Sequence, residues 1–552
     1  MSWKFDWNPL FLKDLRVLLR DRKAERRGWW GVAMVCAPAV VLLVLQFAFP
    51  GIFARVGRYV LLGYGILSNV AALGAVAIAA TAIVAEREKN TYEVLQVSPV
   101  TPERLFLGKA LFAVYGVFVR QVLLLVPMAV VYLSGGFPFH VLLLYQVVLL
   151  ATDFFIASLG LYVSAQPHRL PKISIAALKH SATRTQVALQ KAMGVSVLFL
   201  ILLPFYAVLI PTFAGAAAAS RAAAGRGGSV EMMPDLSLLG TICPAVTLAF
   251  WGEVEVFGLP VPLWLLSVGC NLLLAKMFFH FGVGQLRGRD RDTSVGGRAC
   301  LLAFVTFAVG LLCGHLGGAG AAGPFVAGCA VTFLFCIVLT PCLSVGELTR
   351  AEQKGFRAEW IANSLSPRRL FRSRVSGAGG FLVLLALLAT PFLWMALGRE
   401  ALPVAATTVV TALGLSALGN RSSRNAKDAP ANKGAFAAFV LMIVFVSTVV
   451  PVLLQVAKKS VPTPAVATAA DVSLAAVVPL NPVASVFLRL MATTGEDVTK
   501  LDELRGEVGP VARHAWLVTC AWYAAIGLLA AVWPRKKEEK PGMVQTCVTP
   551  PA

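Results

Sequence analysis

Long apolar stretches alternate with short polar ones along almost the whole chain. About twelve of these stretches are long enough to cross roughly 30 Å of hydrocarbon as helices. The two-residue alternation typical of membrane barrels is absent, so the pattern predicts an all-α polytopic membrane protein. The expected spans lie near residues 29–50, 59–85, 105–133, 139–165, 192–214, 259–281, 299–319, 323–346, 378–397, 402–420, 434–456 and 514–533.

Composition supports the same class. Apolar residues make up 58% of the 552 residues and charged residues only 14%, with a mean hydropathy of +0.75. A soluble protein of this length does not tolerate that balance. The ten cysteines show no C-x-x-C pair and the six histidines are scattered. We therefore expect neither a metal site nor a disulfide framework.

The distribution of charge predicts the topology. With the N-terminus inside and the sides alternating, inside loops and span flanks hold 36 Lys and Arg, against 11 outside and two within spans, which makes the total of 49. This is the positive-inside rule, so the net charge of +21 requires no nucleic-acid partner. It places both termini in the cytoplasm and the protein in the cytoplasmic membrane. The first span lacks a cleavage site and is expected to be retained.

The basic N-terminal segment predicts an interfacial helix that contacts membrane lipid. Asn8-Pro9 is suited to start a helix. Apolar residues then share one face while basic residues lie off it, which favours a helix lying on the inner leaflet. An alternative is a cytoplasmic extension of the first span. The apolar positions are Phe11, Leu15, Leu18 and Leu19, and the basic ones are Lys13, Arg16 and Arg20.

The chain also contains a weak internal repeat. Residues 101–106 align without gaps on residues 366–371, inside two polar loops, 85–109 and 351–374. Two outside segments, 215–258 and 457–513, each contain a short semi-apolar stretch after a proline (244–250 and 482–488) that could re-enter the membrane. We therefore expect two tandem six-span halves with parallel pseudo-two-fold symmetry. The expected parts are a first half at 1–281, a basic linker at 282–298, a second half at 299–533 and a cytoplasmic tail at 534–552.

Motifs for catalysis are missing from the sequence. There is no Walker A pattern, no H-E-x-x-H and no G-x-S-x-G, so we expect a protein that is not itself an enzyme and binds no cofactor. One pair of ionisable residues falls within spans. Arg120 and Asp153 lie at nearly equal distances from the outside turn near residue 136, which puts them at the same depth. We expect an ion pair that locks this hairpin, the alternative being a substrate-path or proton-coupling role.

The loop 85–109 has the most specific pattern in the chain. Its residues E-R-E-K-x-T-x-E-x-L-x-x-S-P, followed by G-K, extend the second span into water before prolines break the helix. The pattern resembles the loop between spans two and three of type-2 ATP-binding-cassette permeases. That resemblance implies a coupling region that touches a separate ATPase subunit, which binds ATP and Mg²⁺. The positions that carry over are Glu86, Glu88, Glu93, Ser98, Pro99, Gly108 and Lys109. A solvated hairpin between two helices is the plainer alternative.

The second loop departs from that pattern. Gln353, Gly355, Phe356 and Ala358 stand where the first loop has Glu88, Asn90, Thr91 and Glu93. Glu359 and Trp360 remain near the expected place, and Pro367 aligns with Pro102. The sequence thus favours the permease of an ATP-driven exporter with unknown cargo. An ion-coupled secondary transporter with twelve spans is the main alternative, and a membrane-embedded enzyme or assembly factor is a third.

Overall fold

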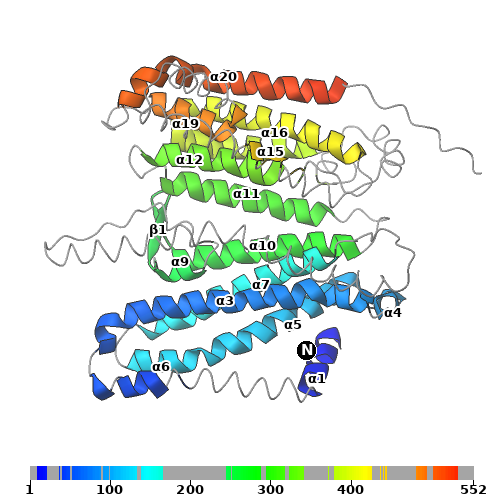
Figure 1. Cartoon of the computed structure of the whole chain (residues 1–552), viewed down its shortest axis with the longest axis vertical. Helices are drawn as coiled ribbons and strands as arrows, with labels where there is room; N and C mark the ends of the chain where they lie inside the picture. The colour runs from blue at the N-terminus through cyan, green and yellow to red at the C-terminus, as the bar shows by residue number, and fades with distance from the viewer. Residues whose placement is uncertain are drawn as a thin grey trace, which may run out of the picture. The chain divides into compact units, whose positions relative to one another are not determined.

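The computed structural model is almost wholly helical in its described residues (Figure 1). It describes residues 9–20, 37, 40–45, 47–49, 52–88, 91–97, 100–133, 138–165, 241, 244–249, 251–286, 294–316, 322–340, 343, 371, 378–425, 436, 439–440, 442–443, 480–493 and 502–532. The longer elements are α1 (Pro9–Arg20), α3 (Ile52–Glu88), α5 (Pro102–Leu123), α6 (Leu125–Leu133), α7 (Phe139–Ala165), α10 (Leu263–Leu286), α11 (Ser294–Leu316), α12 (Ala322–Phe333), α15 (Ala378–Leu397), α16 (Ala401–Asn425), α19 (Pro482–Thr493) and α20 (Asp502–Val532).

Five helical stretches in the described residues are long and apolar enough to cross a membrane: Pro102–Leu133, Phe139–Ala165, Leu263–Leu286, Val295–His315 and Gly379–Gly419. The fold is therefore that of an all-α membrane protein, as the hydropathy pattern predicts. Helices α7 and α15 begin and end at the bounds expected for the spans 139–165 and 378–397. The expected spans 192–214 and most of 29–50 and 434–456 lie outside the described residues, as do the tail 534–552 and, apart from Phe371, the loop 351–374.

Contacts divide the chain into two compact units. One comprises Met1–Val331, Lys354–Ser376 and Leu384–Leu402, and the other comprises Thr332–Gln353, Gly377–Val383 and Pro403–Ala552. This division does not coincide with the linker expected at 282–298. Helix α10 continues to Leu286 and α11 begins at Ser294, so both helices extend into that linker.

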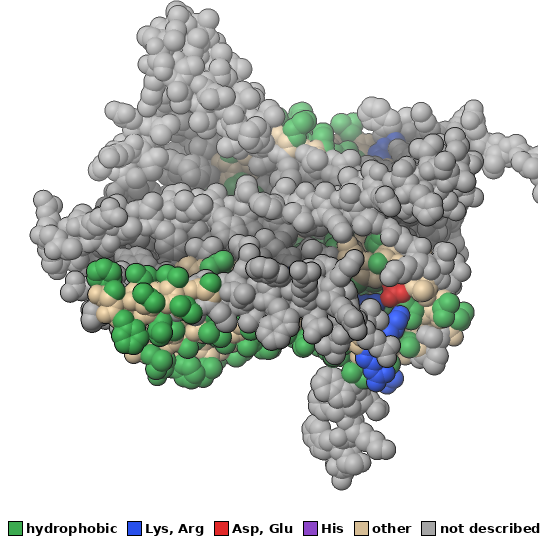
Figure 2. Space-filling view, turned by 60° about the horizontal axis from the view of Figure 1, so that its bottom comes forward, with side chains coloured by type: hydrophobic (Ala, Val, Ile, Leu, Met, Phe, Trp, Pro, Cys, Tyr) green, Lys and Arg blue, Asp and Glu red, His purple; other side chains and the backbone are tan. Residues whose placement is uncertain are grey.

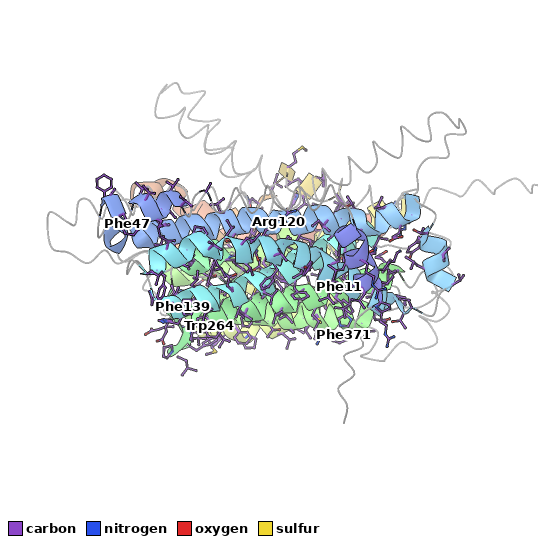
Figure 3. The ribbon with its side chains drawn as sticks, turned by 90° about the horizontal axis from the view of Figure 1, so that it is seen from below. Phe11, Phe47, Arg120, Phe139, Trp264 and Phe371 are labelled. Atoms are coloured by element: carbon purple, nitrogen blue, oxygen red, sulfur yellow. The ribbon has the colours of Figure 1, made fainter. Side chains whose placement is uncertain are left out.

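In the first unit, α3, α5, α7 and α10 pack against one another (Figure 1). Tyr64 and Tyr145 meet edge to face with ring centroids 5.9 Å apart, and Leu149 is fully buried beside them. Figure 3 shows Phe139 and Trp264 toward one end of this layer and Phe11 toward the other, with Arg120 between them. We call the helix ends near Phe11 the charged end, because the ion pairs of Lys109 and Lys13 with Glu86 and of Lys109 with Asp14 lie there.

Two local features depart from the expected spans. The stretch 105–133 is interrupted at Leu124, which separates α5 from α6. The span expected at 259–281 starts later, because Leu259–Pro262 forms strand β2, paired antiparallel with β1 (Glu253–Val256). The turn between them places Phe257 at φ 53° and Gly258 at φ 76°, in the left-handed region that glycine adopts readily.

The two semi-apolar stretches predicted after prolines are both short helices. Helix α9 (Pro244–Ala249) packs against α3, α7 and α10, and α19 packs against α20. Asn481 caps α19, since its Oδ1 accepts hydrogen bonds from the backbone N–H groups of Val483 and Ala484. Proline suits the first turn of each helix because its missing N–H has no partner there anyway.

Small residues and hydroxyl groups join the helices of the second unit. Thr332 and Thr408 lie 3.1 Å apart between α12 and α16, and Ser485 and Thr519 lie 2.8 Å apart between α19 and α20. Thr408 and Thr519 also donate to carbonyls of their own helices, as hydroxyls do in apolar surroundings. The start of α15 lies beside α16, because a Cβ at Gly379 would sit 3.3 Å from Leu413.

Helices α16 and α20 cross at closely packed glycines, and this predicts a sharp size limit. A Cβ on Gly414 would lie 2.4 Å from the backbone oxygen of Tyr523, and a Cβ on Gly527 would lie 3.4 Å from the Gly414 Cα. We expect Gly414→Ala to lower the free energy of unfolding by about 1–3 kcal/mol, because the helices must separate. The measurement is thermal unfolding in detergent. The control is Gly269→Ala in α10, where no atom lies within 4 Å of the new Cβ. Equal unfolding temperatures for the two variants would contradict the close crossing.

Candidate functional site: the charged end of α1, α3, α5 and α7

A buried lysine joins three helices at the charged end. The Nζ of Lys109, in α5, lies 2.7 Å from Oε1 of Glu86 in α3 and 2.8 Å from Oδ2 of Asp14 in α1. The three side chains are only 6%, 12% and 15% exposed, respectively. An ammonium group has three donors, so one lysine can satisfy both carboxylates at once. Charge-assisted bonds of this length are among the strongest that side chains form.

Glu86 has further partners that hold it in its charged form. The hydroxyl of Thr91 donates to the Glu86 carboxylate and, at 3.1 Å, to the Glu86 carbonyl. Lys13 Nζ lies 3.8 Å from Glu86 Oε1. Burial by itself raises the pKa of Glu86, which lies just beyond the predicted span 59–85. The hydrogen bonds from Lys109 and Thr91 and the positive charges of Lys109 and Lys13 outweigh it, so the pKa lies below the ordinary value of 4.5.

The end of α7 is tied to the same end of α3. Ser164 Oγ accepts hydrogen bonds from the backbone N–H groups of Ile83 and Val84, at 3.2 and 3.3 Å. Arg87 donates to the carbonyl oxygen of Ala165 at 3.0 Å. The Arg87 guanidinium also lies over the ring of Tyr92, 5.0 Å from its centroid, a favourable cation–π geometry. These contacts fix the direction in which the chain leaves α3.

Helix α1 uses its apolar face against α5. Leu10 and Phe11 are buried, and the Phe11 ring meets the ring of Tyr115 edge to face at 6.1 Å. The structure thus confirms a helix at the N-terminus that begins at Pro9, with Phe11 on its buried face. Apolar contact and the Asp14–Lys109 ion pair act together to seat α1 beside the start of α5.

The loop between α3 and α5 contains a short helix, α4 (Thr91–Val97), which exposes apolar side chains. Val94 is 65% exposed and Val97 is 85% exposed. After α4, Thr101 caps α5: its hydroxyl accepts from the backbone N–H of Arg104, and Pro102 occupies the first turn. Figure 2 shows acidic and basic side chains close together in one area, with hydrophobic side chains beside them.

The structure brings together two of the residues singled out in this loop, Glu86 and Lys109, and buries Gly108 beside Lys109. Glu88 ends α3 and Glu93 lies in α4, but their side chains fall outside the described part. Ser98 and Pro99, and the second-loop residues Glu359 and Pro367, also lie outside the described residues.

Sequence reasoning did not assign Asp14, Thr91 and Ser164 to this site. Asp14 belongs to a helix expected to contact lipid headgroups, and an acidic residue among basic ones was the available signal. Thr91 stands within the loop pattern, next to a helix start, where hydroxyl residues favour local hydrogen bonds. Nothing in the sequence pairs Ser164 with residues some 80 positions earlier.

The Arg120–Asp153 ion pair expected from equal depth is not formed, and this prediction is wrong. Asp153 is fully buried and its Oδ1 accepts a hydrogen bond from Gln121 Nε2 at 3.2 Å, while Arg120 is exposed. Neighbouring residues on a helix point about 100° apart, because a turn takes 3.6 residues. The count along the chain predicted the depth within one residue, but it did not predict which residue of α5 faces α7.

Among the described residues no group of three or more His, Cys, Asp or Glu could hold a metal ion. What the charged end can do is mechanical: it fixes α1, α3, α5 and α7 to one another beside an exposed apolar helix. Comparisons of the whole chain with protein-family models, with curated proteins and with solved structures find no match.

Removing the Lys109 ammonium group is expected to destabilise the fold. In Lys109→Met, Glu86 and Asp14 lose their shared partner while remaining largely buried, and we expect the free energy of unfolding to fall by about 3–5 kcal/mol. Thermal unfolding in detergent measures the effect. The matched control is Lys13→Met, whose side chain is 51% exposed and contributes about 0–1 kcal/mol. Similar losses in both variants would contradict a central role for Lys109.

The charged end also predicts a dependence on acid. Because the folded pKa of Glu86 lies below its ordinary value, ionised Glu86 stabilises the fold fully above pH 4.5 and loses this effect as the pH falls through the lowered folded pKa. We expect the unfolding temperature of the natural protein to fall in that acid range. Glu86→Gln should have a lower unfolding temperature at neutral pH and a weaker acid dependence. An unchanged acid profile in this variant would show that other carboxylates cause the loss.

Proposed function

We propose that this chain is the membrane-spanning permease of an ATP-binding-cassette exporter, moving a substrate across the cytoplasmic membrane. Separate ATPase subunits bind ATP and Mg²⁺, and this chain has no catalytic centre of its own. In this proposal it has about twelve spans in two six-span halves related by a pseudo-two-fold axis along the membrane normal. Both termini face the cytoplasm, as the asymmetry of its Lys and Arg residues favours.

The observation that carries this proposal is the ionic cluster of Lys109, Glu86 and Asp14. It lies at the base of the loop whose residues resemble the coupling region of type-2 permeases. A coupling region must be stiff, because a force applied to a loose loop is absorbed by the loop itself. The buried ion pairs and the Ser164 hydrogen bonds supply that stiffness where α3, α5 and α7 end.

The exposed apolar side chains of α4 support the same proposal. Val94 and Val97 stand on a two-turn helix flanked by charged residues, the composition of a small contact surface for another protein. When the ATPase subunits close, they would push on α4. The push would pass through Glu86 to Lys109 and move α3 and α5 as a body together with α1.

An ion-coupled secondary transporter is the second candidate, and Asp153 favours it, because a buried carboxyl at span depth is a common element of ion pathways. Such carriers usually place several ionisable groups at that depth. Among the side chains that the structure describes, Asp153 is the only Asp or Glu that is fully buried. The cluster at the charged end favours the permease over the carrier.

The test is co-purification of an ATPase with the tagged chain in mild detergent. We expect nucleotide-hydrolysing activity with the natural chain and at least a tenfold loss in the Val94→Asp, Val97→Asp double variant, equivalent to about 1.4 kcal/mol. The control is Leu259→Asp, which introduces one aspartate in strand β2 at an apolar position whose side chain is 66% exposed.

An intact chain that brings down no ATPase would overturn the permease proposal. Transport in proteoliposomes driven by an ion gradient without nucleotide would then support the carrier. If the α4 and Leu259 variants recover equal ATPase activity, α4 does not contact the ATPase. The permease proposal would then still stand.

A further inference from the structure

Two buried polar side chains, Gln121 near the end of α5 and Asp153 in the middle of α7, each have one oxygen without a hydrogen-bond partner among the described residues. Gln121 and Asp153 are both fully buried. One hydrogen bond joins them, from Gln121 Nε2 to Asp153 Oδ1 at 3.2 Å. The other oxygen of each group, Gln121 Oε1 and Asp153 Oδ2, has no hydrogen-bond partner in the described structure. A buried oxygen without a hydrogen-bond partner destabilises a fold, and here two such oxygens belong to one contacting pair.

The pair lies deep in the apolar layer. Gln121 follows Lys109 by twelve residues of continuous helix, and Asp153 precedes Ser164 by eleven. At about 1.5 Å per residue, both lie some 16–18 Å from the charged end. That is more than half of the roughly 30 Å of hydrocarbon that the spans cross. An ionised carboxylate at this depth needs a cation beside it.

The described structure places no such cation beside Asp153. Arg120 is exposed on another face of α5, and Asp153 takes part in no ion pair. Its one hydrogen bond is to Gln121. On its own helix and on the helices packed against it, none of the charged or titratable side chains that the structure describes bonds to it. These described side chains are Tyr64, Glu86 and Arg87 on α3, Glu103, Arg104, Lys109, Tyr115 and Arg120 on α5, Cys270, Lys276 and His280 on α10, and His140, Tyr145 and Tyr162 on α7 itself.

We propose that Asp153 is a proton-binding site, in which the protonated carboxyl forms a two-bonded acid–amide pair with Gln121. The proton resides on Asp153 Oδ2 and is donated to Gln121 Oε1, while the existing bond from Nε2 to Oδ1 remains. Both oxygens without partners are then satisfied by a single proton. The terminal torsions of Asp and Gln have broad minima, so the two planar groups can align at little cost.

The proton therefore acts as a ligand that joins α5 to α7. Without it, Asp153 Oδ2 and Gln121 Oε1 are two acceptors that both lack a donor in the described part of the chain, and a negative charge remains buried in hydrocarbon. With it, the pair is neutral and both of its oxygens are bonded. This inference does not rest on the proposed function, since a permease and an ion-coupled carrier would both contain the site.

The experiment is infrared spectroscopy of the full-length protein in lipid at neutral pH. A protonated carboxyl has a C=O stretching band that an ionised one lacks. We expect such a band in the natural protein, its loss in Asp153→Asn and its persistence in Glu253→Gln, a control that removes an exposed carboxyl of β1. In Gln121→Leu the band should remain and shift to higher frequency, because the carboxyl loses its hydrogen-bond partner.

Each outcome decides the proposal. Absence of an Asp153-dependent band at neutral pH would show that the carboxyl is ionised and overturn the proton site. A band that Gln121→Leu leaves unmoved would overturn the acid–amide pair. Should Asp153→Asn fail to accumulate, aspartate labelled with carbon-13 at the side-chain carboxyl must shift the band in the natural protein. An unshifted band would likewise overturn the assignment.

Discussion

A single ammonium group at the edge of the apolar layer holds the start of the fold together. Lys109 is nearly buried, and an unpaired charge in that position would be strongly unfavourable, so it needs a carboxylate partner, and Glu86 and Asp14 each supply one. This requirement brings α1 and α3 to α5, and the backbone of α3 is then tied to Ser164 of α7. Apolar contacts alone would let these helices pack at several positions along one another. The polar contacts fix a single position.

Polar groups farther from the charged end also join neighbouring helices, but through hydrogen bonds between uncharged side chains and backbone groups. Tyr64 accepts from Gln146, and Tyr145 donates to the Gly65 carbonyl, between α3 and α7. In the second unit, paired threonine and serine hydroxyls lie between α12 and α16 and between α19 and α20. Hydrophobic burial gives little preference between apolar helices in lipid, so these few bonds and the close glycine contacts select which faces meet.

Much of the helical architecture could be predicted from the sequence, because apolar length and charge asymmetry act locally. The bounds of α7 and α15 follow from the apolar runs, and the N-terminal helix follows from Pro9 and the spacing of apolar residues. The sequence did not predict the hairpin of β1 and β2, because the apolar residues of β2 continue directly into the apolar run of the expected span. The same hydropathy value suits a strand and a helix, so composition could not separate them.

The sequence by itself determined that the chain crosses a membrane as helices, that Glu86 and Lys109 belong to one distinctive loop, and that position 153 carries a carboxyl at mid-span. Only the tertiary structure decided that Asp14 shares Lys109 with Glu86 and that Gln121, not Arg120, faces Asp153. Position along a helix fixes depth through the 1.5 Å rise, whereas the facing partner depends on rotation about the helix axis. That rotation is set by the packing of all the neighbouring helices together, which no local pattern contains.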